Sequence, residues 1–91
     1  MSQPGVRREV CFRGRVQGVG FRFTTSEIAA RFRVGGFVEN LADGSVLLVA
    51  EGEPAEVDRF LEAVEAELGR FIAGANANES AAPTGSASQG Q

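Results

Sequence analysis

The amino-acid sequence predicts an α+β fold in which an antiparallel sheet carries two helices on one face. Two segments repeat apolar residues at the spacing of a helix, and three others alternate or run apolar as strands do. An Asp-Gly pair, which is a strong hairpin signal, separates two of the strand-like segments. The 91 residues are enough for one domain of modest size.

The first strand is predicted over Val6–Val16. Its side chains divide between two faces, one with Val10, Phe12, Gly14 and Val16 and the other with Cys11, Arg13 and Arg15. Such a division is expected in a sheet that is covered on one face only. The segment Gln17–Gly20 then interrupts the pattern with two glycines, which indicates a loop with unusual backbone angles.

A helix is predicted directly after this loop. Residues at offsets of 0, 4, 7, 8 and 11 from Phe21 share one face of a helix. They are Phe21, Thr25, Ile28, Ala29 and Phe32. Glycine is common just past the end of a helix. We therefore expect Gly35-Gly36 to terminate this one.

Two strands, Gly36–Leu41 and Ser45–Gly52, are predicted to form a hairpin around Ala42-Asp43-Gly44. The apolar run Val46–Ala50 indicates that the second strand is central. Pro54 then opens a second helix at the position that proline tolerates best. The apolar face of this helix consists of Val57, Phe60, Leu61, Val64 and Leu68, and Gly69 is expected to end it.

After Arg70 the strand signal is weak, because Ala73–Ser80 consists mainly of residues that are uncommon in strands. The order of elements nevertheless indicates a ferredoxin-like split βαβ sandwich of four strands, with a fifth edge strand weak or absent. We expect the domain to span residues 6–79. Residues 80–91 are rich in Ala, Ser, Gly and Gln and are expected to form a flexible C-terminal tail.

The amino-acid composition excludes several classes of catalytic site and indicates the charge of the ligand. The chain has no histidine and a single cysteine, Cys11, so His-dependent nucleophile pairs and an internal disulfide are excluded. It has no apolar run of membrane-spanning length and no signal-peptide pattern, so we expect a cytoplasmic protein. The net charge is −3, yet residues 1–35 carry seven Arg against two Glu, a net of +5, which favours an anionic ligand.

The segment Gly14–Arg22 is the best candidate site. A strand ends, a glycine-rich loop turns and a helix begins with Arg22 in its first turn. Main-chain N–H groups in such a loop, the helix start and the Arg22 guanidinium can together bind one tetrahedral oxyanion. The segment has neither the Gly-Lys-Ser/Thr of a Walker A loop nor the third glycine of a dinucleotide fingerprint. The alternative is a simple turn with a surface arginine.

The segment Gly14–Arg22 resembles the first acylphosphatase signature. The segment Gly36–Asn40, followed by Gly44-Ser45-Val46 and Gly52, resembles the second. Both motifs have the right order and separation, and the resemblance runs from about Arg8 to Leu68. The family is ferredoxin-like, in agreement with the fold predicted from the elements.

The resemblance implies an enzyme that hydrolyses the carboxyl-phosphate bond of acyl phosphates. It implies that Arg22 and Asn40 are catalytic, with Asn40 orienting the attacking water. It also implies a phosphate-binding loop made of Gln17, Gly18, Val19, Gly20, Phe21 and Arg22. No metal, cofactor or covalent phosphoenzyme is implied.

This chemistry is compatible with the absence of histidine. An acyl phosphate has a good leaving group, so positioning and charge stabilisation can suffice, and a phosphate oxygen can accept the proton of the water. From the residues alone, Asn40 is explained equally well as a turn-former ahead of Asp43-Gly44. Asp43 itself is assigned to the turn.

Two features depart from the family pattern. Glu39 stands where a basic or neutral residue is more usual, although strand alternation points it away from Asn40. Family members also close with two clear strands, whereas Phe71–Gln91 offers only Phe71 and Ile72 as bulky apolar residues. We expect this ending to reduce stability and to loosen the support of the loop.

Two alternative functions follow. The first is a catalytically weak module that binds phosphate or carbamoyl phosphate, like the acylphosphatase-like domains of larger maturation proteins. The second is a nucleic-acid binder, which is disfavoured because the exposed strand face offers Arg13 and Arg15 but no aromatic pair, and the pI is about 4.9. The expected partners are therefore an acyl phosphate and inorganic phosphate, without nucleic acid or membrane, and the expected state is a monomer.

Overall fold

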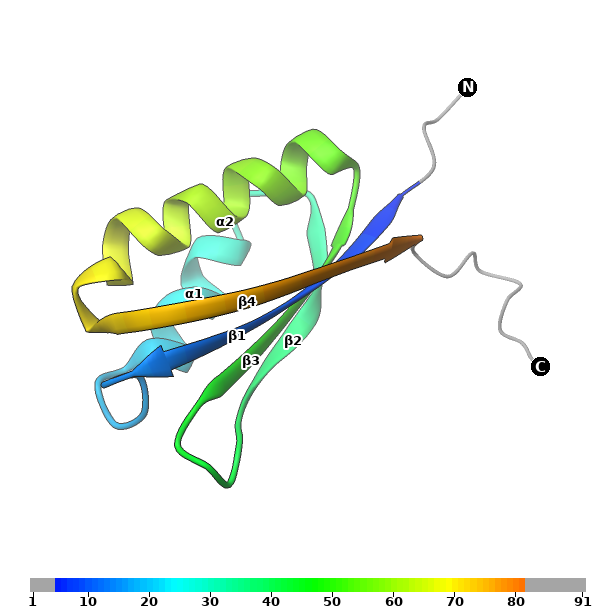
Figure 1. Ribbon diagram of the computed structural model, residues 1–91. Helices are drawn as coiled ribbons and strands as arrows, with labels where there is room; N and C mark the ends of the chain where they lie inside the picture. Colours follow the sequence, from blue (N-terminus) through cyan, green and yellow to red (C-terminus); the bar gives the residue numbers. More distant parts are fainter. Residues whose placement is uncertain (1–4, 82–91) are drawn as a thin grey trace.

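A computed structural model describes residues 5–81 and places two helices on one face of an antiparallel sheet (Figure 1). The elements in chain order are β1 (Val6–Gly14), α1 (Phe21–Ala29), β2 (Val34–Asn40), β3 (Val46–Gly52), α2 (Pro54–Leu68), a 3₁₀ turn (Gly69–Phe71) and β4 (Ile72–Ala81). The strand order is β2-β3-β1-β4, with every neighbouring pair antiparallel. The predicted α+β, ferredoxin-like plan is confirmed.

The core lies between the sheet and the two helices, as the apolar patterns predicted. β1 and β3 contribute alternate side chains from the covered face, and each helix contributes one apolar stripe. The buried set includes Val10, Phe12, Phe21, Ile28, Val46, Leu48, Ala50, Val57, Phe60 and Val64. Cys11 lies on the other face and is partly exposed. The apolar strand β3 is central, also as predicted.

The glycine pair 35–36 has a different role from the one predicted. α1 ends at Ala29, a turn follows over residues 30–33, and both glycines lie inside β2. Gly36 has φ of +128°, and a Cβ atom at this position would lie 1.8 Å from the carbonyl oxygen of Val49. Glycine is therefore needed here for the close approach of β2 to β3, and not as a helix stop.

The segment that looked poorest as a strand forms the ten-residue strand β4. It pairs with β1 from Val6↔Ala81 to Gly14↔Ile72, so the long partner strand supplies the hydrogen bonds that composition could not predict. Arg8 of β1 adds ion pairs to Glu79 of β4 and to Asp58 of α2.

β4 remains lightly packed toward the helices. Its inward residues Ala75 and Ala77 lie opposite Phe12 and Val10, and the small side chains leave a hollow of about 360 Å³ beside α2. The strand includes Ser80 and Ala81. Residues 82–91, the rest of the expected tail, lie outside the described residues.

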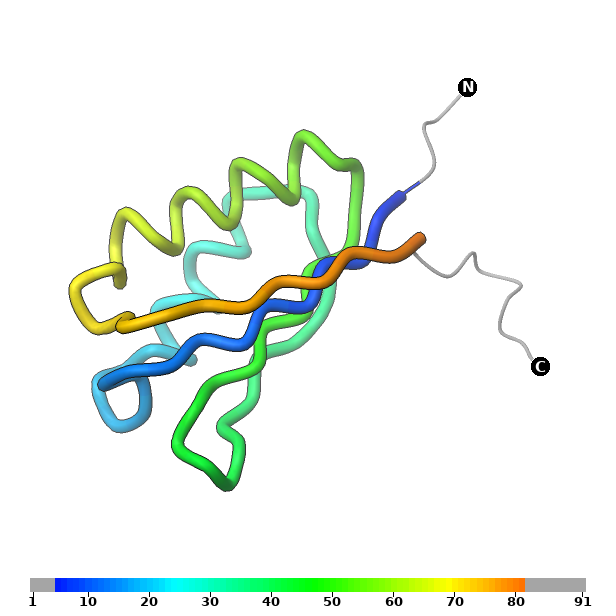
Figure 2. Tube along the Cα trace, viewed as in Figure 1, coloured from blue at the N-terminus to red at the C-terminus, as the bar shows by residue number. Residues whose placement is uncertain are grey.

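The trace shows which parts of the chain meet at the ends of the sheet (Figure 2). The loop between β1 and α1 and the β2–β3 hairpin project at the same end, next to each other. Among residues 5–81 no helix combines the length and the apolar character that are needed to cross a bilayer.

The two neighbouring glycines of β2 provide a matched test of the close approach to β3. We expect Gly36→Ala to lower the free energy of unfolding by about 2–4 kcal/mol, because the new methyl group would require both a strained φ and a shift of the backbone. Urea unfolding at 25 °C measures this change. Gly35→Ala is the control, since no atom lies within 4 Å of its Cβ position. Equal effects of the two substitutions would contradict the interpretation.

Candidate functional site

The glycine-rich loop is anchored in the core at both ends. Val16, which precedes it, is 0% exposed, and Phe21, which follows it, is 2% exposed. The N–H of Arg15 donates to the carbonyl oxygen of Phe71 at 2.9 Å, so the turn that precedes β4 also holds the chain as it leaves β1. The loop is thus a short connection between fixed points.

Within the loop, Gly18 and Gly20 both adopt left-handed backbone angles, with φ of +81° and +78°. No atom lies within 4 Å of either Cβ position, so glycine is needed here for conformation rather than for space. Gly20 is also the N-cap of α1, and no side chain caps this helix end. The N–H groups of the first turn, which carries no acidic residue, therefore favour an anion.

The β2–β3 hairpin forms the opposite wall of the site. Asn40 is the last residue of β2, and the N–H of Leu41 donates to the carbonyl oxygen of Ser45 at 2.8 Å to close the turn. Asp43 accepts hydrogen bonds from the Ser45 hydroxyl at 2.5 Å and from the Ser45 N–H at 2.9 Å. Asp43 therefore belongs to the turn, as predicted.

These hydrogen bonds also act on the ionisation of Asp43. The Ser45 hydroxyl is the larger cause and the Ser45 N–H the next, and together they hold the pKa of Asp43 below its ordinary value of 3.8. Asp43 is thus a carboxylate at neutral pH and keeps the turn closed.

Gln17 joins the loop to the hairpin. Its side-chain Nε2 donates to the carbonyl oxygens of Leu41, at 2.8 Å, and of Ser45, at 2.9 Å. The side chain is half-buried and lies against the hairpin.

A hollow of about 280 Å³ opens between the loop and the end of β2. Its lining consists of Val16, Gly18, Gly20, Phe21, Arg22, Phe23 and Asn40. Arg22 is exposed and its side chain makes no hydrogen bond or ion pair with another residue of the described segment, so its guanidinium is available to a ligand. The hollow therefore presents a cation, the main-chain groups of a helix start and a carboxamide.

The structure brings together most of the residues singled out in the sequence. Arg22 and Asn40 line the same hollow, and so do Gly18, Gly20 and Phe21 of the loop. Two residues of the expected phosphate-binding set, Gln17 and Val19, are not part of the lining.

Phe23 is a lining residue that the sequence reasoning missed. Its side chain is 69% exposed at the rim of the hollow. A signal was present, because Phe23 lies beside Arg22 but off the apolar stripe of α1. A large aromatic side chain on the polar face of a helix is a candidate for ligand contact.

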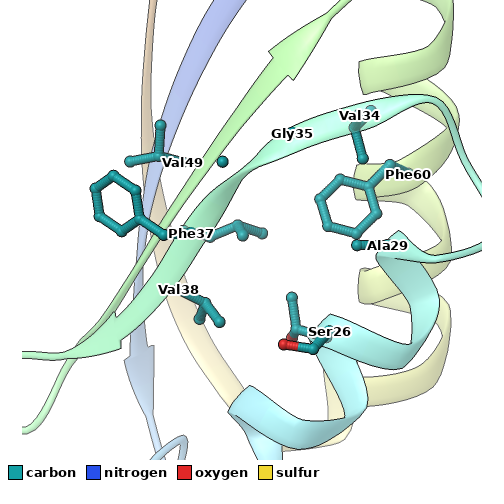
Figure 3. Close-up of a pocket in the computed structure, with 11 residues that line it drawn as sticks. Ser26, Ala29, Val34, Gly35, Phe37, Val38, Val49 and Phe60 are labelled. Carbon is teal, nitrogen blue, oxygen red and sulfur yellow. The ribbon is translucent and has the colours of Figure 1, made fainter.

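Two other hollows are poorly suited to an anion. One of about 120 Å³ lies between α1 and β2 and is lined by residues such as Ala29, Val34, Val38 and Phe60, with no charged side chain (Figure 3). The hollow beside α2 is flanked by acidic residues, and Arg8, its cation, is already paired with two carboxylates. Among residues 5–81 no three His, Cys, Asp or Glu side chains gather as a metal site would require.

Comparisons with known proteins point to one family. The family model described as acylphosphatase matches residues 8–82. An acylphosphatase of Lacticaseibacillus paracasei is 46% identical over 59 residues, which are 65% of this chain and 63% of the relative. An acylphosphatase of Oceanobacillus iheyensis is 49% identical over 57 residues, which are 63% of each chain. The match thus spans less than two thirds of these relatives' length.

Solved structures agree with this likeness. The crystal structure of acylphosphatase from Bacillus subtilis has a TM-score of 0.74 at 31% identity and covers 82% of this chain and 84% of that one. Full-length HypF, solved in a phosphate- and nucleotide-bound form, has a TM-score of 0.75 at 26% identity. This similarity covers 89% of the present chain but only 11% of HypF.

The lowered pKa of Asp43 gives a pH-dependent prediction. We expect Asp43→Ala to reduce the free energy of unfolding at pH 7, because the turn loses its charged acceptor. A depressed carboxyl pKa contributes stability that is present above the unfolded value of 3.8 and is lost as the pH falls through the folded value. The difference between Asp43→Ala and the natural chain should therefore shrink below pH 3.8.

Urea unfolding from about pH 2 to pH 7 measures this dependence, because this range covers the titration of ordinary carboxyl groups at roughly pH 3–5. Glu62→Ala is the control, since Glu62 is exposed and its side chain makes no hydrogen bond or ion pair with another described residue. A difference for Asp43→Ala that stays constant at all pH values would show that its carboxylate does not hold the turn.

Proposed function

Because this chain belongs to the acylphosphatase family, we propose that it hydrolyses the carboxyl-phosphate bond of acyl phosphates and releases a carboxylate and inorganic phosphate. The observation that supports this most strongly is the shared hollow, in which Arg22 from α1 and Asn40 from β2 face one space. The two elements are separated in the chain but adjacent at one end of the sheet.

We assign phosphate binding to the loop and to Arg22. The main-chain N–H groups from Gln17 to Arg22 and the guanidinium are donors, and a phosphoryl group offers three oxygens that accept hydrogen bonds. Hydrogen bonds to a charged group are worth about 1.5–3 kcal/mol each, so a few of them can hold the anion without a metal. The two left-handed glycines leave open space above the backbone for its approach.

We assign water orientation to Asn40. Its carboxamide oxygen can accept a hydrogen bond from water and hold it in line with the scissile bond. The water oxygen then bonds to phosphorus, and the bond from phosphorus to the acyl oxygen breaks with its electron pair remaining on the carboxylate. The proton released by water passes to a phosphate oxygen, so no side-chain base is required.

The leaving acyl group has an apolar surface available. Phe23 lies at the rim of the hollow with most of its ring exposed. A carboxylic acid fragment can pack on this ring while its phosphate is held by the loop. We expect the protein to act in the cytoplasm as a monomer on such small molecules, without nucleic acid as a partner.

The likeness to a small part of full-length HypF favours a second candidate function. In that case the chain is a module that binds phosphate or carbamoyl phosphate with little turnover. Titration calorimetry with phosphate separates the two candidates when it is combined with an activity assay. Binding without hydrolysis selects the module.

The catalytic assignments predict the effect of two substitutions. We expect Arg22→Ala and Asn40→Ala each to lower kcat/KM for benzoyl phosphate by about 100-fold or more, because each removes a group that acts on the reacting phosphoryl centre. Release of phosphate in the presence of EDTA measures the rate and also tests for metal dependence.

Arg31→Ala and Asn78→Ala are the matched controls. Both remove the same side chains at exposed positions outside the hollow and should retain the rate of the natural chain. Equal rates in the natural chain, Arg22→Ala and Asn40→Ala would contradict the assignment.

A further inference from the structure

We propose that the side chain of Gln17 is a positioning residue, which fixes the β2–β3 hairpin, and with it Asn40, against the anion-binding loop. This inference rests on the proposed function of the site. It also assigns Gln17 a task other than direct phosphate binding, in which only its main-chain N–H takes part.

The two hydrogen bonds of Gln17 leave little freedom to its side chain. Both acceptors are main-chain carbonyl oxygens, of Leu41 and of Ser45, so only the NH₂ end of the amide can face them. The usual ambiguity between the nitrogen and the oxygen of an amide is therefore resolved by the partners. Both protons of Nε2 are engaged with the hairpin.

The two acceptors lie where the hairpin closes. The carbonyl oxygen of Ser45 also accepts the N–H of Leu41, and that of Leu41 also accepts the N–H of Gly44 at 3.1 Å. Leu41 directly follows Asn40 in the chain. A shift of these carbonyl groups would therefore move the main chain that carries the carboxamide of Asn40.

The sheet itself gives this end of the hairpin little support. The β1–β3 ladder ends at Phe12↔Val46, and the β2–β3 ladder ends at Asn40↔Val46. The turn over residues 41–45 thus projects beyond Phe12, the last residue of β1 that pairs with β3. Within residues 5–81, the two bonds from Gln17 are the only side-chain hydrogen bonds between this turn and the glycine-rich loop.

Such a connection should matter for the rate more than for phosphate binding. The phosphate donors belong to the loop and Arg22, which stay in place without the Gln17 amide. The water held by Asn40 must be aligned with the phosphorus, and a misplacement of about 1 Å can reduce a rate by about 100-fold. Removal of the amide should therefore lower kcat and leave phosphate affinity intact.

Gln17→Met tests this, because methionine keeps the length of the side chain and lacks the donor. We expect kcat for benzoyl phosphate to fall by about 10- to 100-fold. The inhibition constant of inorganic phosphate, measured in the same assay, should stay within about twofold, since the loop N–H groups and Arg22 are unchanged. Leu61→Ala, which weakens packing in α2 away from the hollow, controls for a general loss of stability and should retain kcat.

A double-mutant cycle shows whether Gln17 acts through Asn40. In the Asn40→Ala background, Gln17→Met should have little further effect on kcat, because the group that it positions is already absent. Amide hydrogen exchange provides a readout that does not depend on turnover. The N–H groups of Leu41 and Gly44 should exchange faster in Gln17→Met, while those in the middle of β3 should not change.

Three results would overturn the proposal: an unchanged kcat in Gln17→Met, a loss of phosphate affinity equal to the loss of kcat, or effects that multiply in the double variant. An absence of turnover in the natural chain would reject the proposed function and this inference together. If the natural chain is active, and if Arg22→Ala abolishes this activity while Gln17→Met does not lower it, this inference alone is rejected.

Discussion

Strand β1 pairs with β3 on one side and with β4 on the other, and both ladders stop just before the glycine-rich loop. The β3 side ends at Phe12↔Val46, and the β4 side ends at Gly14↔Ile72, followed by the bond from Arg15 to Phe71. Main-chain N–H groups after this point have no strand to donate to. The loop can therefore offer them to a ligand, and the end of pairing in the middle of the sheet sets the position of the proposed anion site.

Local pairing removes two arginines of the basic N-terminal segment from the candidates for binding the proposed anion. Arg7 is engaged by Glu9 and Glu51, and Arg8 by Asp58 and Glu79. Such partly exposed pairs add little stability, but they neutralise the guanidinium groups of Arg7 and Arg8. Arg22 has no acidic partner among the described residues and lies at a helix start that carries no carboxylate in its first turn. Arg13 and Arg15 also lack an ion pair among residues 5–81, but only Arg22 of these three lines the hollow.

Regular patterns made most of the fold predictable from the sequence, and the exceptions were positions where distant parts of the chain meet. Alternation along β1 and the apolar stripes of the helices reflect burial on a single face. Such burial can be recognised from the sequence, because each position is either apolar or polar. The conformation of Gly36 depends on a carbonyl oxygen of the neighbouring strand, and the formation of β4 depends on the length of β1.

The candidate site also has one part that the sequence predicted and one part that it did not. Two motifs indicated Arg22 and Asn40, whereas the partners of the Gln17 side chain lie 24 and 28 residues away and could not be read from local sequence.

The C-terminal strand shows why an unusual composition need not disturb the site. β4 contributes small side chains to the covered face, yet the residue just before it, Phe71, supports the loop through its main-chain carbonyl oxygen. This hydrogen bond between main-chain atoms requires that the strand forms, but it does not depend on which side chains the strand carries. The hairpin is held in the same manner, since Gln17 binds two carbonyl oxygens and reads neither the Leu41 nor the Ser45 side chain. Support of this kind depends on the path of the main chain, which Gly36 and the Asp43 turn help to fix, and not on the side chains of the residues whose carbonyl groups accept the hydrogen bonds.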